Sequence, residues 1–345
     1  MRIVIFKLNA FGDNVVFVPA VQALRTRFPN WEITLITTPN EAELYHGPLA
    51  PQRILVSTKQ GFNKSHHRPW VLASWIWRIR SIVPDGCLLP FDQGSAAHLV
   101  AKLSGAKTRI GGNISHIKVR NSLTEVVAYP EDARPVTWNW RVAGALARSF
   151  APGADWPETP PPPDLTHLYD ARVLAPKGAK RVVVHAGASR SLNRWSHERF
   201  SSVAAALARD FEVIWVVHGE ATLPVPIGAV AAEVKSVREL AGLISGSSLF
   251  LGNNSGPMHL ANALGCPGVA VSGPSAFGWD PYWYADRWAV LRHPNLYCAP
   301  CGKPDSQVPG CANKDSPMAC LDYWTPERVE AACRSMLAKH FERIQ

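Results

Sequence analysis

Short apolar runs alternate with stretches whose apolar residues recur at helical spacing along most of the chain. Runs with the length and apolar content of buried strands occur at Arg2–Lys7, Glu32–Thr37, Arg53–Val56, Gly86–Leu89, Lys180–His185, Val213–Val217, Leu249–Leu251 and Gly268–Val271. Helical spacing predicts helices at Asn14–Phe28, Trp70–Val83, His197–Ala208, Val237–Ser245 and Gly256–Leu264. Strands that alternate with helices predict parallel, doubly wound sheets, so the pattern indicates the α/β class.

A proline-rich stretch divides these elements into two series. Pro157 and the prolines from Pro160 to Pro163 leave little room for a helix or a strand. With 345 residues, of which 47% are hydrophobic, the chain can build about two domains, each with its own core. We therefore expect an N-terminal domain over residues 1–155, a linker over 156–176 and a C-terminal domain over 177–345.

The most informative segment runs from Leu249 to Leu260, where a buried strand ends and a helix begins. Asn254 or Ser255 suits the N-cap, and Pro257 suits the first helical turn. Gly256 lets a ligand approach the backbone closely, and the first N–H groups of a helix favour an anion, so a phosphate or diphosphate site is expected here. An ordinary strand-to-helix turn, with His259 as a buried structural residue, is the alternative.

Two further loops follow predicted strands and carry polar side chains. Asp13 lies after the first strand, where it can serve as a general base or merely as a helix N-cap. After the strand that ends at His185, Gly187 and Ser189 can present N–H and hydroxyl groups to a phosphate, and Arg194 can add a forked cation. A solvent-exposed role for Arg194 is equally compatible with this segment alone.

The formal net charge of +9 predicts an anionic partner. Basic residues gather in the first half of the chain, at His66, His67, Arg68, Arg78, Arg80, Arg109, Lys118 and Arg120. No dense tract of Lys and Arg interleaved with aromatic residues occurs, which disfavours nucleic-acid binding. A membrane surface or a phosphorylated substrate therefore remains as the expected partner.

Four of the seven cysteines, Cys298, Cys301, Cys311 and Cys320, fall within the loop 298–320, which is rich in glycine and proline. This grouping suits tetrahedral coordination of a structural zinc or iron ion by thiolates. Unlinked thiols are the alternative, because the spacing is not that of a common zinc finger. Cys87, Cys266 and Cys333 look like small buried hydrophobic residues.

The sequence contains no apolar run long enough to span a bilayer, since Arg78 and Arg80 interrupt Trp70–Val83. The apolar start of the chain reads as a first strand and is too short for the core of a signal peptide. We therefore expect a cytoplasmic protein.

Three motifs in order resemble glycosyltransferase family nine, which includes the ADP-heptose–lipopolysaccharide heptosyltransferases. They are Phe11-Gly12-Asp13 with Pro19-Ala20 and Leu24, Gly187-Ala188-Ser189 before Arg194-Trp195, and the run from Gly252 to Ala261. The resemblance extends from Met1 to about Ala338, and the cysteine loop before Thr325 is similar to one found in many members.

The resemblance implies a GT-B fold, in which two Rossmann-like domains face each other across a cleft, and an inverting reaction that needs no catalytic metal. Asp13 would be the base that activates the acceptor hydroxyl. The donor would be held by Gly187, Ser189, Arg194, Asn254, Ser255, Gly256, Pro257 and His259. Arg194 stands where the family usually has a lysine, and Asn254 stands where it usually has an aspartate near the donor sugar hydroxyls. An amide there keeps an acceptor but removes the charge, which leaves the donor sugar open.

The expected activity is transfer of a sugar, mainly heptose from ADP-heptose, to an anionic cell-envelope glycolipid such as the lipopolysaccharide core. Arg68 and Arg120 are the candidate acceptor-binding residues, and the enzyme is expected in the cytoplasm, including the inner surface of the cytoplasmic membrane. Alternatives are another nucleotide sugar, a protein acceptor, or a non-catalytic protein that binds a sugar nucleotide or a nucleic acid.

Overall fold

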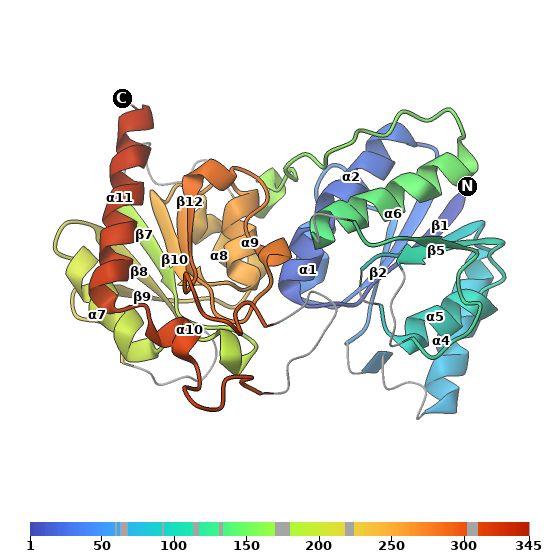
Figure 1. Ribbon diagram of the computed structural model, residues 1–345. Coiled ribbons are helices and arrows are strands. Elements are labelled where there is room, and N and C mark those ends of the chain that lie inside the picture. The colour runs from blue at the N-terminus through green and yellow to red at the C-terminus, as the bar shows by residue number, and fades with distance from the viewer. Residues whose placement is uncertain are drawn as a thin grey trace. The chain divides into compact units, whose positions relative to one another are not determined.

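The computed structural model describes residues 1–58, 61–62, 68–91, 93–112, 117–130, 134–169, 180–217, 224–301 and 310–344. The chain forms two compact units, Met1–His167 and Leu168–Gln345, each built on a parallel sheet (Figure 1). None of the helices in these ranges is both long enough and apolar enough to cross a membrane.

The N-terminal unit contains a six-stranded parallel sheet in the order β3-β2-β1-β4-β5-β6. Its strands are β1 (Arg2–Lys7), β2 (Glu32–Thr37), β3 (Arg53–Val56), β4 (Gly86–Leu89), β5 (Thr108–Gly112) and β6 (Glu125–Val127). Its helices are α1 (Phe11–Val15), α2 (Val18–Arg27), η1 (Glu41–Tyr45), α4 (Pro69–Ile82), α5 (Ser95–Leu103) and α6 (Pro135–Phe150). Helix α2 packs with α6 and α4 packs with α5, and the two pairs cover opposite faces of the sheet (Figure 1).

The C-terminal unit repeats this topology, with the order β12-β11-β10-β7-β8-β9. Its strands are β7 (Arg181–His185), β8 (Glu212–Val217), β9 (Val230–Glu233), β10 (Leu249–Asn253), β11 (Gly268–Val271) and β12 (Trp288–Leu291). Its helical segments are η4 (Ser191–Asn193), α7 (His197–Leu207), α8 (Val237–Ile244), α9 (Gly256–Ala263), η5 (Phe277–Trp279), η6 (Ala285–Arg287), α10 (Ala319–Asp322) and α11 (Pro326–Ile344), while η3 (Thr166–Leu168) spans the boundary between the units. In both units the first strand lies between the second and the fourth, which is the Rossmann arrangement, and such sheets bind ligands at the carboxyl ends of those central strands.

The predicted strands agree closely with the structure, because buried parallel strands are continuous apolar runs. The prediction of one helix over Asn14–Phe28 is wrong. Helix α1 already begins at Phe11 and ends at Val15, and α2 begins at Val18 with Pro19 in its first turn. Proline lacks the N–H that would bond to the carbonyl four residues earlier, so a continuous helix is excluded at this position.

The proline-rich stretch predicted as a linker is partly bound to the N-terminal unit. Gln22 and the backbone of Asp164 exchange hydrogen bonds of 2.6 and 2.9 Å, and Trp140 Nε1 donates to the carbonyl of Pro157 at 2.6 Å. Its first half therefore runs along α2 and α6, while its final residues, 170–176, lie outside the described ranges.

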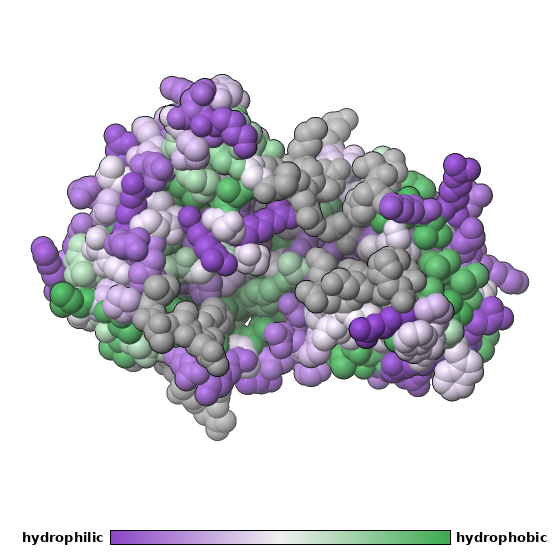
Figure 2. Space-filling model, turned by 90° about the horizontal axis from the view of Figure 1, so that it is seen from below, coloured by the Kyte–Doolittle hydropathy of each residue, from purple (hydrophilic) through white to green (hydrophobic). Residues whose placement is uncertain are grey.

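The molecular surface is unevenly coloured by hydropathy. Figure 2 shows green apolar patches beside purple hydrophilic groups on the right, the side of the N-terminal unit on which α4 and α5 lie in Figure 1. The large apolar residues exposed there include Trp70 and Trp77 of α4.

Candidate functional site

A pocket of about 600 Å³ opens at the carboxyl ends of β7 and β8. It is lined by the loop after β7, including Gly187, Ser189 and Arg194, and by Trp215 of β8. Three of the predicted donor-binding residues are thus brought together. The volume lies in the range of small-molecule sites, which are usually about 300–1,000 Å³.

Asn253, the last residue of β10, ties this loop to the neighbouring strand end. Its fully buried side chain donates from Nδ2 to the carbonyl oxygens of Ala186 and Gly187, at 2.8 and 3.3 Å, and its Oδ1 accepts the N–H of Trp195 at 2.8 Å. Sequence reasoning did not assign Asn253 to the site. Its only sequence signal is that it is a polar residue at the end of an apolar strand. Such a buried polar side chain needs hydrogen-bond partners, and here the loop after β7 supplies them.

Helix α9 begins directly beyond this junction, with Ser255 as its N-cap residue. The Ser255 hydroxyl makes no capping hydrogen bond and instead donates to the carbonyl of Asn253 at 3.3 Å. Gly256 and Pro257 form the first turn, and Asn193 of the β7 loop donates to the carbonyl of Asn254 at 3.5 Å. The start of α9, which favours anions, therefore adjoins the loop that lines the pocket.

His259 lies one turn into α9 and is only 6% exposed. Its ring packs edge-on against Trp279 with 5.8 Å between ring centres. Burial lowers the pKa of His259 to about 4, so the imidazole is neutral at pH 7. It can therefore offer a hydrogen bond to a ligand but no positive charge.

Asn254 belongs to a buried polar network along the carboxyl edge of the sheet. Its Nδ2 donates to Ser272 Oγ at 3.2 Å and to Asp280 Oδ1 at 3.1 Å. Asp280 is paired with Arg292, whose guanidinium also donates to the carbonyls of Ser275 and Ala276. Because the carboxylate only accepts, the amide must point its N–H₂ group toward it, which leaves Asn254 Oδ1 as the acceptor of this side chain.

Arg194 is an exposed residue at the pocket wall. Its Nε donates to the carbonyl of Ala188 at 2.5 Å, which holds the guanidinium against its own loop. The next residue, Trp195, is buried, and its Nε1 donates to the carbonyl of Trp324 at 3.0 Å. The loop is thus fixed on one side by Asn253 and on the other by the segment before α11.

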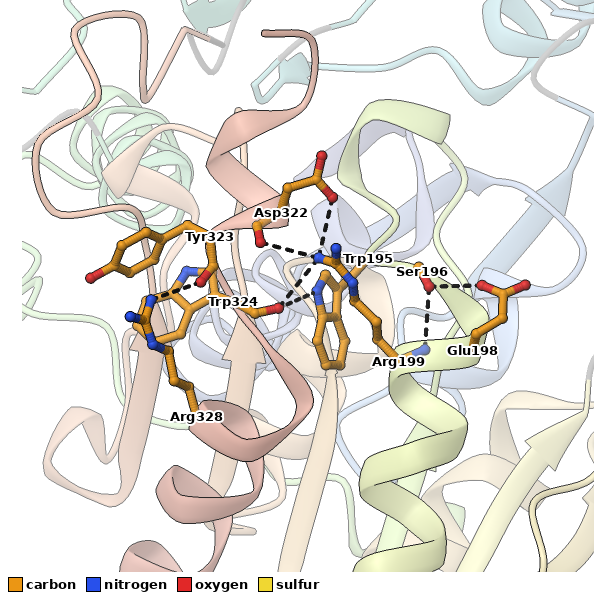
Figure 3. Close-up of polar contacts among 8 residues, drawn as sticks. All are labelled: Trp195, Ser196, Glu198, Arg199, Asp322, Tyr323, Trp324 and Arg328. Carbon is orange, nitrogen blue, oxygen red and sulfur yellow. Dashed lines mark hydrogen bonds and ion pairs between the residues drawn. The ribbon is translucent and has the colours of Figure 1, made fainter.

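Figure 3 shows how that segment is attached to α7. Arg199 donates to the carbonyls of Asp322 and Trp324, at 3.2 and 3.4 Å, and pairs with the Asp322 carboxylate at 3.2 Å. Arg328 donates to the carbonyl of Tyr323 at 2.9 Å (Figure 3). These contacts join the end of the cysteine-bearing segment to the helix that follows the pocket loop.

The four cysteines of that segment, Cys298, Cys301, Cys311 and Cys320, line one cavity of about 20 Å³. Leu192 of the pocket loop lines the same cavity. The Cys311 sulfur accepts the N–H of Met318 at 3.4 Å, and burial raises the pKa of Cys320 to about 11. Within the described ranges, no three His, Cys, Asp or Glu side chains lie close enough together to hold one ion. Residues 302–309 of the loop lie outside those ranges.

Asp13 lies in the N-terminal unit, inside the short helix α1 rather than at its N-cap. The buried Asn14 beside it fixes this helix, because it donates to the carbonyls of Asn9 and Ala10 and accepts from Thr37 and Tyr45. Burial, together with the charges of Glu41 and Asp13, raises the pKa of Tyr45 well above its usual value. Asp13 is therefore held on a rigid element at the carboxyl end of β1.

The two predicted acceptor-binding residues also lie in the N-terminal unit, and both are exposed. Arg68 is the N-cap residue of α4, and the carbonyl of Arg120 accepts a hydrogen bond from Lys102 at 2.8 Å. His66 and His67, which belong to the predicted basic group, lie outside the described residues.

Part of this chain resembles a known protein family. Residues 150–311 match the model of glycosyltransferase family 9 (heptosyltransferase). Lipooligosaccharide heptosyltransferase 2 of Campylobacter jejuni subsp. jejuni serotype O:2 is 27% identical over 176 residues, which cover 46% of this chain and 52% of that protein. The chain thus spans about half the length of the curated relatives it matches.

Solved structures with the same fold cover nearly the whole chain. E. coli heptosyltransferase WaaC with ADP-2-deoxy-2-fluoro heptose has a TM-score of 0.71 at 15% identity, covering 97% of this chain and 99% of that one. The iron-containing dodecameric glycosyltransferase TibC from enterotoxigenic E. coli has a TM-score of 0.60 at 16% identity, covering 100% of this chain and 76% of that one. The predicted GT-B fold class is confirmed by these similarities, and so is the resemblance to the family.

We predict that the neutral state of His259 makes stability depend on pH. The unfolded histidine binds a proton below about pH 6.5, whereas the folded one resists protonation down to about pH 4. The free energy of unfolding should therefore fall by on the order of 2 kcal/mol between pH 7 and pH 4.5 through this group. Urea unfolding of His259→Gln should show a flatter pH dependence, and His197→Gln should behave like the parent. Equal slopes for parent and His259→Gln would contradict the prediction.

We also predict that Asn254→Asp destabilises this chain, because it places a second carboxylate beside Asp280. The 3.1 Å contact would become repulsive, at a cost of about 1–3 kcal/mol near pH 7. Asn254→Asp/Asp280→Asn restores one amide and one carboxylate and should recover much of the loss. Thermal unfolding of both variants, with Asp280→Asn completing the cycle, measures the coupling. A stable single Asn254→Asp variant would show that the contact is unimportant.

Proposed function

We propose that this chain, whose residues 150–311 match the model of glycosyltransferase family 9, is an inverting glycosyltransferase that moves heptose from ADP-heptose to a cell-envelope glycolipid such as the lipopolysaccharide core. The observation that carries the proposal is the pocket at the carboxyl ends of β7 and β8, beside the start of α9. A small-molecule cavity and an anion-binding helix end would then meet beside the switch point of the Rossmann sheet, which lies between β7 and β10.

The diphosphate of the donor would lie at the start of α9 and against the β7 loop. Backbone N–H groups around Gly256 and the hydroxyls of Ser189 and Ser255 offer hydrogen bonds, and Arg194 offers the positive charge. His259 would add a neutral hydrogen-bonding group. The rest of the pocket, with Trp215 on its wall, has room for a nucleoside.

The amide at position 254 is compatible with a heptose donor. Both N–H bonds of Asn254 are directed to Ser272 and Asp280, so the group presents only an oxygen acceptor to the sugar, as an aspartate would. The negative charge missing from residue 254 stands on Asp280, where Arg292 balances it. Hydroxyl donors of the sugar would therefore meet the same hydrogen-bonding pattern.

Asp13 would serve as the general base. It accepts the proton of the acceptor hydroxyl while the hydroxyl oxygen bonds to the anomeric carbon and the bond from that carbon to the diphosphate oxygen breaks, which inverts the configuration. The departing diphosphate gains negative charge, which Arg194 and the start of α9 would stabilise. Arg68 and Arg120 are the proposed contacts for the anionic acceptor, and the enzyme would act at the inner face of the cytoplasmic membrane.

We predict that Asp13→Asn lowers turnover at least about a hundredfold, because an amide cannot take the proton. Affinity for ADP, measured by calorimetry, should stay within about twofold, since Asp13 belongs to the other unit from the pocket. Turnover is measured as the release of ADP from ADP-heptose in the presence of a lipopolysaccharide-core acceptor. Near-normal turnover of the variant would exclude Asp13 as the base.

Arg194→Ala is the matched control, because it changes the donor site and leaves Asp13 in place. A charged hydrogen bond to phosphate is worth about 1.5–3 kcal/mol, so ADP affinity should fall by about one to two decades. Unchanged affinity would mean that Arg194 points into solvent. If neither variant differs from the parent and no nucleotide sugar binds, the proposed activity is wrong.

We further propose that the four loop cysteines hold one structural metal ion, zinc or iron. Their chemistry fits, because four thiols line one cavity, their neighbours are mainly apolar, and a backbone N–H already points at the Cys311 sulfur. The iron of TibC supports iron as one of the two choices. Four protein thiolates leave no open position for substrate, so the ion would fix the fold of the loop and take no part in transfer.

Metal analysis of the purified chain should find about one ion per chain, and Cys298→Ser and Cys320→Ser should lose both the ion and thermal stability. Cys266→Ser changes a buried cysteine outside the loop and should keep the ion. A parent chain that carries no metal when purified under reducing conditions, with all four loop thiols titratable, would refute the site.

A further inference from the structure

Helix α4 carries two tryptophans on its outer surface. Trp70 is 71% exposed and Trp77 is 70% exposed, whereas Trp75 and Ile79 of the same helix are buried in the core. Residues seven apart lie on one face of a helix, about two turns from each other. The two indoles therefore lie along one line of the surface, with the small residue Ala73, also exposed, between them. Two tryptophans exposed at this spacing are not explained by packing among the residues that the structure describes.

The same helix carries positive charge beside the indoles. Arg78 and Arg80 are exposed, and α4 contains no acidic residue. Arg78 lies over the ring of Trp75 at 4.6 Å, and Arg80 donates to the carbonyl of Leu103 at 3.2 Å. Within the part of the chain that the structure describes, neither forms an ion pair. Their charges are therefore available to an external partner.

The charge of the whole chain is concentrated in this part of the N-terminal unit. Residues 53–124 contain 11 Lys and Arg residues and two Asp residues, a difference that equals the formal net charge of +9. One of the two acids, Asp85, already accepts the N–H of Arg2 at 2.7 Å. Helix α5, which packs against α4, adds the exposed Lys102. The mixture of apolar and strongly hydrophilic groups on this side is visible in Figure 2.

We propose that the outer face of α4 docks the protein onto an anionic lipid bilayer. Indole rings prefer the boundary between lipid headgroups and acyl chains, and arginines beside them reach the phosphate groups. Each basic residue near such a surface strengthens binding by roughly fivefold. A second copy of this chain is a poor occupant because two equally basic surfaces repel each other. The proposal rests on the proposed function in bringing the protein to a membrane, and it adds a defined membrane-facing surface that contains no donor-site residue.

The test is flotation of the full chain with vesicles of phosphatidylcholine, with and without phosphatidylglycerol. The parent should float with the anionic vesicles only, and less at high salt. Trp70→Ala/Trp77→Ala and Arg78→Gln/Arg80→Gln should each weaken binding at least about tenfold. Matched controls, which should float like the parent, are Ile227→Ala, at an 88% exposed apolar residue of the C-terminal unit, and Arg141→Gln/Arg148→Gln, at exposed arginines of α6.

ADP binding and thermal unfolding of each variant separate this proposal from the proposed function. Both should match the parent, because α4 belongs to the other unit from the donor pocket. Failure of the parent to bind anionic vesicles, or parent-like flotation of both double variants, overturns the proposal. Binding of a nucleic-acid oligomer that depends on the arginines but not on the tryptophans, without vesicle binding, would also overturn it and assign the surface to nucleic acid.

Discussion

The proposed donor site depends on the buried side chain of Asn253. One amide group satisfies two carbonyl oxygens of the loop after β7 and one N–H at the start of the Trp195 segment, and it does so from the end of β10. A buried donor or acceptor left without its partner costs about 1–3 kcal/mol, so this single residue fixes the loop strongly. The pocket wall and the start of α9 then have fixed positions relative to each other. The binding groups are therefore oriented before any ligand arrives, which reduces the cost of binding.

The same loop is also held from the opposite side, by a segment more than a hundred residues later in the chain. Trp195 bonds to the carbonyl of Trp324, and Arg199 bonds to that carbonyl and to Asp322. Leu192 faces the cavity lined by the four cysteines. If the segment that carries the four cysteines unfolded, the loop after β7 would lose these contacts. This connection gives a physical reason for a structural ion in a protein whose proposed chemistry requires none.

Sequence patterns predicted the elements where one physical rule dominates. Buried parallel strands such as β1 and β11 are continuous apolar runs with polar or glycine boundaries, and their bounds agree with the prediction. The break between α1 and α2 was missed, although Pro19 signals it. Strands β5, β6, β9 and β12 were also missed. Of these, β6, β9 and β12 lie at sheet edges, where no apolar run is required.

The site was predictable only where its residues lie close together in the sequence. The loop after β7 and the start of α9 stand out locally by their glycines, serines and proline. The partners of Asn254 could not be found in this way, because Asp280 and Arg292 are 26 and 38 positions away and meet only through the order of β10, β11 and β12. An ion pair formed across strand ends has no periodic signal in the sequence.

The distribution of charge between the units matches the ligands that we propose for each. The proposed donor site would rely mainly on neutral groups, namely hydroxyls and backbone N–H groups of the pocket loop and the start of α9 and the uncharged His259 of α9, together with the cation Arg194. Fixed dipoles can stabilise charge that develops on a leaving group without rearranging. The net positive charge lies instead in residues 53–124, where Arg68, Arg78, Arg80, Lys102 and Arg120 are exposed. There it acts over a distance of about 8–10 Å at ordinary ionic strength, which suits the capture of an extended anionic surface.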